Sequence, residues 1–168
     1  MRRRAILVIF VLAAFLAVFA SSGNAAKPVR GPALGPPSLS FPAGVVCPFE
    51  VYAEALVNRQ TETIFSDGRI VYTGFFLTKV ANVENDEELT LVSQGPVRLE
   101  PEGQNLRISS QGPIIFFFFP GDAGPGDDSV GRTYFFHGNT STLVDPATGA
   151  FLSFDYVGKA TDLCAALA

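Results

Sequence analysis

Cys47 and Cys164 are the only cysteines in this 168-residue sequence, and a thiol can act as a nucleophile, a metal ligand or half of a disulfide. Neither lies in a Cys-x-x-Cys pair or next to a histidine, so nothing nearby in the sequence would activate a thiolate or complete a zinc site. If the chain is exported, an oxidising compartment favours pairing of the two. The sequence therefore predicts a Cys47–Cys164 disulfide, which closes a long loop and stabilises the fold by about 4–5 kcal/mol in the chain-entropy account.

The side chains needed for other common chemistries are scarce. His137 is the only histidine, and the sequence contains no Gly-x-Ser-x-Gly nucleophile motif. Because a nucleophile needs a base within hydrogen-bond reach, the sequence indicates no catalytic residue. A glycine-rich loop offers three aspartates as oxygen ligands for Ca²⁺, but their spacing does not match an EF-hand; they are Asp122, Asp127 and Asp128. We predict neither a metal site nor a cofactor.

Phenylalanine is the most unusual feature of the composition. The chain has 16 phenylalanines and no tryptophan, and thirteen of the phenylalanines follow residue 26. Phenylalanine buries a large apolar area without needing a polar partner, so a core filled by these rings is the interpretation we favour. The alternative is an apolar cavity inside a closed barrel, open to a small lipid or aromatic ligand.

The N-terminal segment has the order of a secretory signal peptide. Three arginines after Met1 precede an unbroken apolar run, 5–20, and then a stretch of small residues that ends at Ala26. The run spans about 24 Å as a helix, short of the roughly 30 Å hydrocarbon core, which favours a cleaved signal over a retained anchor. We predict a signal peptide at 1–26, with cleavage after Ala25 as an alternative, and a secreted or cell-envelope protein. If this segment stays uncleaved, it is the only part of the chain that we expect to enter a membrane.

Loss of this segment changes the charge of the chain. The full sequence has a net charge of −4, and removal of the three arginines lowers it to −7. An acidic chain of this length is not expected to bind nucleic acid, to hold several domains or to span a membrane several times. The next segment, 27–44, contains five prolines and is predicted to be an extended tether, because proline excludes helices and central strands. The domain is then 45–168.

The rest of the sequence follows a two-residue period. Around 49–57 the apolar residues share one face and two glutamates lie on the other, as in a half-buried strand. The turn 66–69 separates this region from a long strand at 70–80. Further strand-like segments, separated by turns, follow as far as 150–157. Residues 114–119 are apolar on both faces, which predicts a central strand that is covered on both sides, or on one side by a partner.

These segments predict an all-β fold of eight or nine short strands. Connections of hairpin length leave no room for crossover helices, so the sheet is expected to be antiparallel. We predict a single antiparallel meander closed into a barrel, since closure removes exposed edges, with a two-sheet β-sandwich as the alternative. Residues 161–167 are expected to form a short C-terminal helical turn capped by Thr161 or Asp162.

Four segments of the sequence resemble small exported β-rich proteins of actinobacteria. They are CPFEV at 47–51, FSDG at 65–68, FFFFPGDAGPG at 116–126 and TDLC at 161–164. The family has no assigned activity, so the resemblance implies export and a β fold, and supplies no catalytic residues. It also places the two cysteines at matching ends of the domain.

The sequence thus favours an exported, non-catalytic binding domain of the cell surface or exterior, with a small apolar molecule as the partner. A small β-barrel enzyme, such as a cyclase or isomerase for an apolar substrate, is the first alternative. A structural or self-associating surface protein is the second, with residues 116–119 as its contact strand.

Overall fold

The computed structural model describes residues 26–168. The predicted signal peptide, 1–26, lies outside the described residues except for Ala26. Within the described range, no helix is long and apolar enough to cross a membrane.

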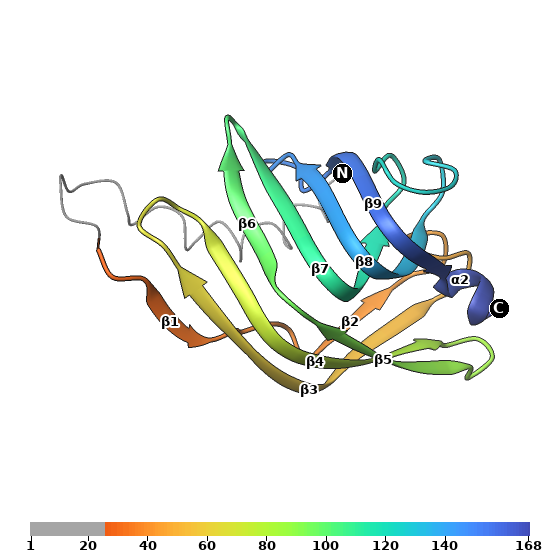
Figure 1. The fold of residues 1–168 in the computed structure, drawn as a ribbon. Coiled ribbons are helices and arrows are strands. Elements are labelled where there is room, and N and C mark those ends of the chain that lie inside the picture. The colour runs from red at the N-terminus through yellow and green to blue at the C-terminus, as the bar shows by residue number, and fades with distance from the viewer. Residues whose placement is uncertain (1–25) are drawn as a thin grey trace.

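The described residues form one antiparallel sheet and a short helix (Figure 1). In chain order the elements are β1 (Val29–Pro32), β2 (Ser38–Phe41), β3 (Val51–Ile64), β4 (Ile70–Asn82), β5 (Glu88–Gln94), β6 (Val97–Glu102), β7 (Asn105–Phe118), β8 (Arg132–Val144), β9 (Phe151–Asp162) and α2 (Leu163–Ala166). The order across the sheet is β1-β3-β4-β6-β7-β8-β9, with β2 also paired to β3 and β5 also paired to β4. The prediction of an all-β antiparallel fold with a short C-terminal helical turn is confirmed.

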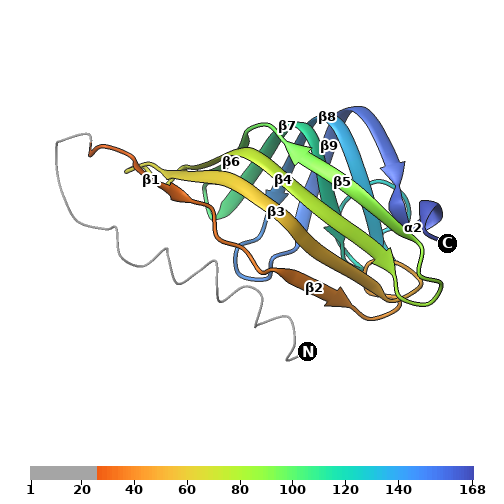
Figure 2. The same ribbon diagram turned by 90° about the horizontal axis from the view of Figure 1, so that it is seen from below.

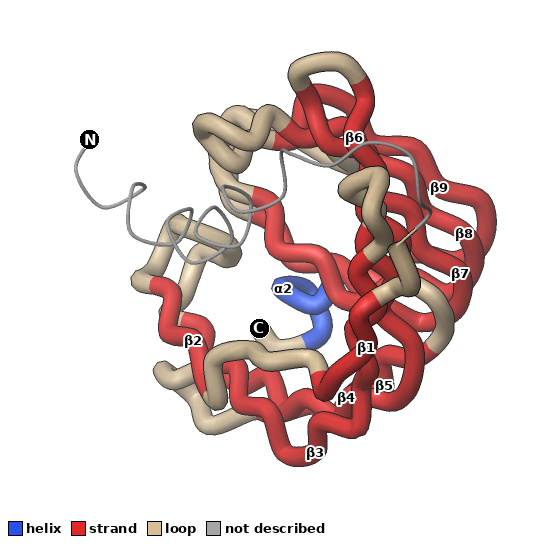
Figure 3. The backbone as a smooth tube through the Cα atoms, turned by 90° about the vertical axis from the view of Figure 1, so that its left-hand side faces the viewer, coloured by secondary structure: helices blue, strands red, loops and turns tan. Residues whose placement is uncertain are grey.

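The sheet is not closed into a barrel, so that part of the prediction is wrong. The pairing ends at β1 and β2 on one edge and at β9 on the other, and in Figure 3 the strands curve around α2. The two edges are bridged by other means: the segment between β2 and β3 reaches the start of β8, and α2 is tied to that segment by the disulfide. The hydrogen bond and the disulfide thus join the two sides of the open sheet without strand pairing.

The long strands bend at a line of glycines that crosses the sheet. Each has a positive φ, and a Cβ there would come within 2.5 Å of a backbone oxygen on the neighbouring strand; they are Gly74, Gly95, Gly112, Gly138 and Gly158. Only glycine combines this backbone conformation with so close an approach. Figure 1 shows β3, β4 and β7 curving strongly along their length.

Ring contacts show how sharply β8 turns at this line. Phe116 is paired with Tyr134 and Phe154 with Thr142, which lie eight positions apart on β8. A straight strand would separate those positions by about 26 Å, yet the rings of Phe116 and Phe154 lie 5.1 Å apart. The halves of β8 on either side of Gly138 therefore fold towards each other.

Two apolar clusters result, and β7 lies between them. The first, the inner core, joins β2, β3, β4, β8 and α2; its buried members are Phe41, Val46, Cys47, Phe49, Val51, Val80, Phe135, Leu163 and Leu167. The second, the aromatic cluster, fills the bend; its members are Phe116, Phe118 and Phe136, with Ile114, Tyr134, Phe151, Phe154 and Ala160 packed against them. Ile115 and Phe117 pack on the inner core. The run 114–119 therefore has apolar neighbours on both faces, as predicted, but only Phe116 and Phe118 are buried and the other face is partly open.

The proline-rich segment 27–44 takes part in the sheet. β1 and β2 lie within it and pair with opposite ends of β3. Both are edge strands of four residues, which is where a sheet tolerates proline. The extended backbone predicted for this segment therefore also hydrogen-bonds to the domain.

Candidate ligand cavity

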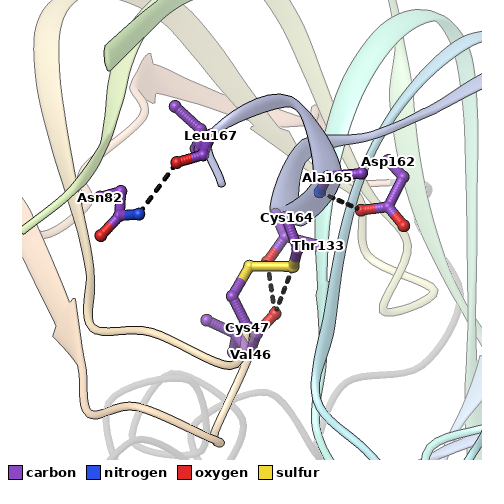
Figure 4. The surroundings of a disulfide bond; sticks show 8 residues. All are labelled: Val46, Cys47, Asn82, Thr133, Asp162, Cys164, Ala165 and Leu167. Carbon is purple, nitrogen blue, oxygen red and sulfur yellow. Dashed lines mark hydrogen bonds between the residues drawn. A yellow bond between two sulfur atoms is a disulfide. The ribbon is translucent and has the colours of Figure 1, made fainter. Parts of the chain in front are cut away.

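The structure joins the two cysteines that the sequence singled out. Cys47 and Cys164 form a disulfide with their Cα atoms 5.4 Å apart (Figure 4). Cys164 lies on α2, which begins after Asp162, and the Asp162 carboxylate accepts a hydrogen bond from the amide of Ala165. The predicted disulfide and the predicted Asp162 cap are thus both present, and a buried disulfide of this kind persists in an oxidising environment.

Polar contacts fix the surroundings of the disulfide. The hydroxyl of Thr133 donates to the carbonyl of Val46 at 2.9 Å, and the side-chain amide of Asn82 donates to the carbonyl of Leu167 at 2.9 Å (Figure 4). Thr133 and Asn82 are both buried. The disulfide therefore belongs to a packed junction between β8, β4 and α2, and its role is structural.

His137 and the three aspartates of the glycine-rich loop do not come together as a site. His137 is exposed, with its ring 4.6 Å from that of Phe135. The Asp122 carboxylate accepts hydrogen bonds from the amides of Phe119 and Phe151, at 2.7 and 3.1 Å. Among residues 26–168, no group of three histidines, cysteines or acids could hold a metal ion.

The glycine-rich loop instead covers the aromatic cluster. Arg132 is buried, and it donates to the Asp128 carboxylate and to the carbonyl of Asp122, both at 2.8 Å. Its guanidinium carbon lies 5.5 Å from the centre of the Phe118 ring, within the range of a cation–π contact. The acids of this loop thus hold it in place over Phe118.

A cavity of about 220 Å³ lies within the curved sheet, on the inner side of β7. Residues of β2, β3, β4, β5, β6 and β7 and of two connecting segments line it: Pro36, Ser38, Leu39, Ala53, Glu54, Ala55, Gln60, Phe76, Thr78, Ser93, Gln94, Gly95, Val97, Ser110, Gln111, Pro113, Ile114, Ile115 and Phe117. Several of these residues, such as Pro36 and Gln111, are exposed, so the cavity reaches the surface. It exceeds the roughly 150 Å³ of an apolar cavity that admits benzene.

Small side chains create the cavity. Lower on the same face, Phe41 and Val80 pack tightly in the inner core. Ala53 of β3 lies opposite Val80, and further along the strands Ala55 lies opposite Thr78 and Ser93 of β5 lies opposite Phe76. The side chains of the two alanines and the serine are too short to reach across the curve of the sheet. A space therefore remains, and Phe76 and Phe117 border it.

Thr78 is the polar group of greatest interest in this lining. It lies on β4 opposite Ala55 of β3 and Leu91 of β5, and it is 6% exposed. Its hydroxyl oxygen is buried and has no hydrogen-bond partner among the described residues. A buried hydroxyl without a partner costs about 1–3 kcal/mol, so a ligand that bonded to it would recover part of that free energy.

The lining carries little charge. Glu54 is its one charged residue within 26–168, and Lys79 lies 3.2 Å from the Glu54 carboxylate. No lysine or arginine of residues 26–168 lines the cavity, so a negatively charged ligand would meet no positive charge there. A neutral, mostly apolar molecule is therefore the best match to the electrostatics.

A perturbed tyrosine lies away from the cavity lining. Tyr72 donates a hydrogen bond of 2.5 Å to the Glu62 carboxylate, and burial together with this bond raises the pKa of Tyr72 above its ordinary value. Neither residue lines the cavity. The residues with hydroxyl groups in the lining are Thr78, Ser38, Ser93 and Ser110, of which Ser110 already bonds to the hydroxyl of Thr140 at 2.6 Å.

From the sequence, an apolar cavity inside a closed barrel is the alternative to a filled core, and its position is not indicated. Ala53, Thr78, Ser93 and Ser110 come from four strands, and only the register of β3, β4, β5 and β7 brings them together. One signal was available: threonine and serine stand on otherwise apolar faces of β4 and β5. That alternation was interpreted as strand pattern alone.

Comparison of the chain with models of protein families, with curated proteins and with solved structures found no match.

Proposed function

We propose that this protein is an exported, non-catalytic binding protein whose cavity takes a small, neutral, apolar molecule with one hydroxyl or carbonyl group. The observation that carries the proposal is an otherwise apolar cavity bordered by Thr78, whose buried hydroxyl has no partner and meets a ligand once the side chain turns towards the cavity. Binding sites of this kind combine an apolar lining with a few polar groups that orient the ligand.

The size of the cavity limits the ligand. A volume of about 220 Å³ is below the roughly 300–1,000 Å³ of sites for drug-sized molecules. It suits a molecule on the order of ten non-hydrogen atoms, larger than benzene. Short terpenoid alcohols, phenols and small ketones have this size and polarity.

Export is supported by the signal-like N-terminal sequence and by the buried Cys47–Cys164 disulfide, which suits an oxidising compartment. The enzyme alternative lacks a comparable observation, because the two tyrosines with raised pKa values, Tyr72 and Tyr134, do not line the cavity. Self-association through 116–119 lacks one too, since Phe116 and Phe118 are buried within the aromatic cluster.

The test uses 2-naphthol, a neutral fluorescent probe with one hydroxyl and eleven non-hydrogen atoms, titrated into the purified oxidised protein. We expect saturable one-to-one binding. Thr78→Val keeps the shape of the side chain and removes the hydroxyl, so it should weaken 2-naphthol binding about three- to tenfold, the effect of one hydrogen bond. Binding of naphthalene, which has no hydroxyl, should be unchanged in the same variant.

Thr142→Val is the matched control. Thr142 is also buried, but its hydroxyl already donates to the carbonyl of Ser153 and it does not line the cavity. Its loss should leave 2-naphthol binding as it was. Absence of saturable binding of either probe to the unmodified protein, or equal weakening by both substitutions, would contradict the proposal.

A further inference from the structure

β9 ends the sheet and leaves a free edge. It has twelve residues and, among residues 26–168, pairs only with β8, and it lies at the opposite end of the sheet from β1 and β2 (Figure 2). Five successive residues, 155–159, are exposed, which means that both faces are open at its centre. Val157 is 75% exposed. A long edge strand of this kind offers unpaired backbone groups to another strand.

The charges on this strand are arranged symmetrically. Asp155 and Lys159 lie two positions on either side of Val157, and all three side chains point to the same face because side chains alternate along a strand. Within residues 26–168 neither Asp155 nor Lys159 has an ion-pair partner. A strand that carries opposite charges equidistant from its centre is complementary to an antiparallel copy of itself.

We propose that β9 pairs with β9 of a second copy of this chain, about a two-fold axis through Val157. In that register Val157 faces Val157 of the second copy, and Asp155 faces Lys159 in two equivalent pairs. Tyr156 lies opposite Gly158, so its ring covers backbone that the glycine leaves bare. The two Gly158 bends lie one residue either side of the axis, so both strands turn within the same short stretch.

The other edge of the sheet is unsuited to the same role. β1 and β2 have four residues each and are separated by a proline-containing segment with Pro36 and Pro37. Proline cannot donate to a ladder, so this edge offers no continuous template for β9. Association is therefore between two β9 strands, which gives a closed dimer instead of an open filament.

Sedimentation equilibrium of the purified oxidised protein tests the pairing. We expect a monomer–dimer equilibrium. Asp155→Lys places two lysines opposite each other, and Lys159→Asp places two aspartates opposite each other, so each should raise the dimer dissociation constant at least about tenfold, since two equivalent pairs turn repulsive. The double variant restores opposite charges and should return the constant to within about threefold of the starting value.

Val157→Asp puts two carboxylates together at the axis and should leave the protein monomeric. Val83→Asp is its control, because Val83 is also exposed but lies in the turn after β4. A monomer at all concentrations up to about 1 mM, assemblies larger than a dimer, a dimer that the single charge reversals leave unchanged, or a dimer that Val83→Asp disrupts would each overturn the proposal. The 2-naphthol titration is read on a different part of the sheet, so the two proposals can fail separately.

Discussion

The two sides of β7 contain similar residues but lead to opposite results. On one side Phe116 and Phe118 pack into the aromatic cluster, and Phe118 is fully buried with its ring 4.9 Å from that of Phe154. On the other side Phe117 is only partly buried: its ring lies 5.0 Å from that of Phe41 and also borders the cavity. The difference comes from the facing strands, since the bend brings several aromatic rings onto Phe118, whereas beyond Phe41 the strands facing Phe117 carry the short side chains of Ala55 and Ser93.

This comparison shows that phenylalanine content alone does not distinguish a core from a binding cavity. The same strand supplies both, because alternate residues point in opposite directions. What decides is whether the opposing side chains are long enough to fill the space.

The largest expected effect comes from truncating the two neighbouring rings of β7. Phe118→Ala should lower the free energy of unfolding by about 3–5 kcal/mol, the cost of emptying a fully packed aromatic site. Phe117→Ala should cost about half as much, because the ring is only partly buried and already borders a void. Urea denaturation of both variants measures the difference. Equal losses would remove the distinction between the two sides.

Gly124 tests how tightly the loop covers the aromatic cluster. A Cβ at this position would lie 2.5 Å from the Phe118 ring, so Gly124→Ala should lower the free energy of unfolding by about 1–3 kcal/mol through overpacking. Gly35→Ala is the control, since a Cβ there meets nothing within 4 Å. If both variants unfold at the same urea concentration as the unmodified protein, the loop does not press on the ring.

Two buried threonines differ in whether the hydroxyl group has a hydrogen-bond partner. Thr78→Val removes a hydroxyl without a partner and should raise the free energy of unfolding by about 1 kcal/mol, whereas Thr142→Val removes one that bonds to the Ser153 carbonyl at 2.7 Å and should lower it by about 1 kcal/mol. Opposite signs in thermal or urea unfolding are the expected outcome. A loss of stability in both variants would mean that Thr78 already has a partner.

The smallest effect is a pH dependence within the aromatic cluster. Burial, and then the negative charge of Asp162, raise the pKa of Tyr134 above its ordinary 10.0. The fold thus favours the neutral phenol: its contribution to stability is fully present below pH 10 and is lost as the pH rises through the raised pKa. The unfolding free energy should fall less steeply above pH 10 in Tyr134→Phe than in the unmodified protein, with both compared at pH 7 as a reference. Parallel curves would show that Tyr134 does not contribute to the fall.

The strands could be predicted from the sequence because their signals are local. Alternation around β3, the two-faced apolar run within β7 and the cap at Asp162 each depend on a few consecutive residues. Closure into a barrel was predicted wrongly because it depends on whether β9 meets β1 and β2. That distance is set by the bends at glycines such as Gly138 and Gly158, whose positive φ the sequence does not reveal.

Local patterns were enough to predict the all-β antiparallel class, the Cys47–Cys164 pairing and the apolar contacts on both faces of residues 114–119. These properties follow from periodicity, from connections too short for crossovers and from the presence of only two cysteines. The tertiary structure alone decided the open sheet, the free edge at β9 and the cavity at Thr78. Those depend on the register between strands far apart in the chain, and therefore on which side chains face one another across the curve of the sheet.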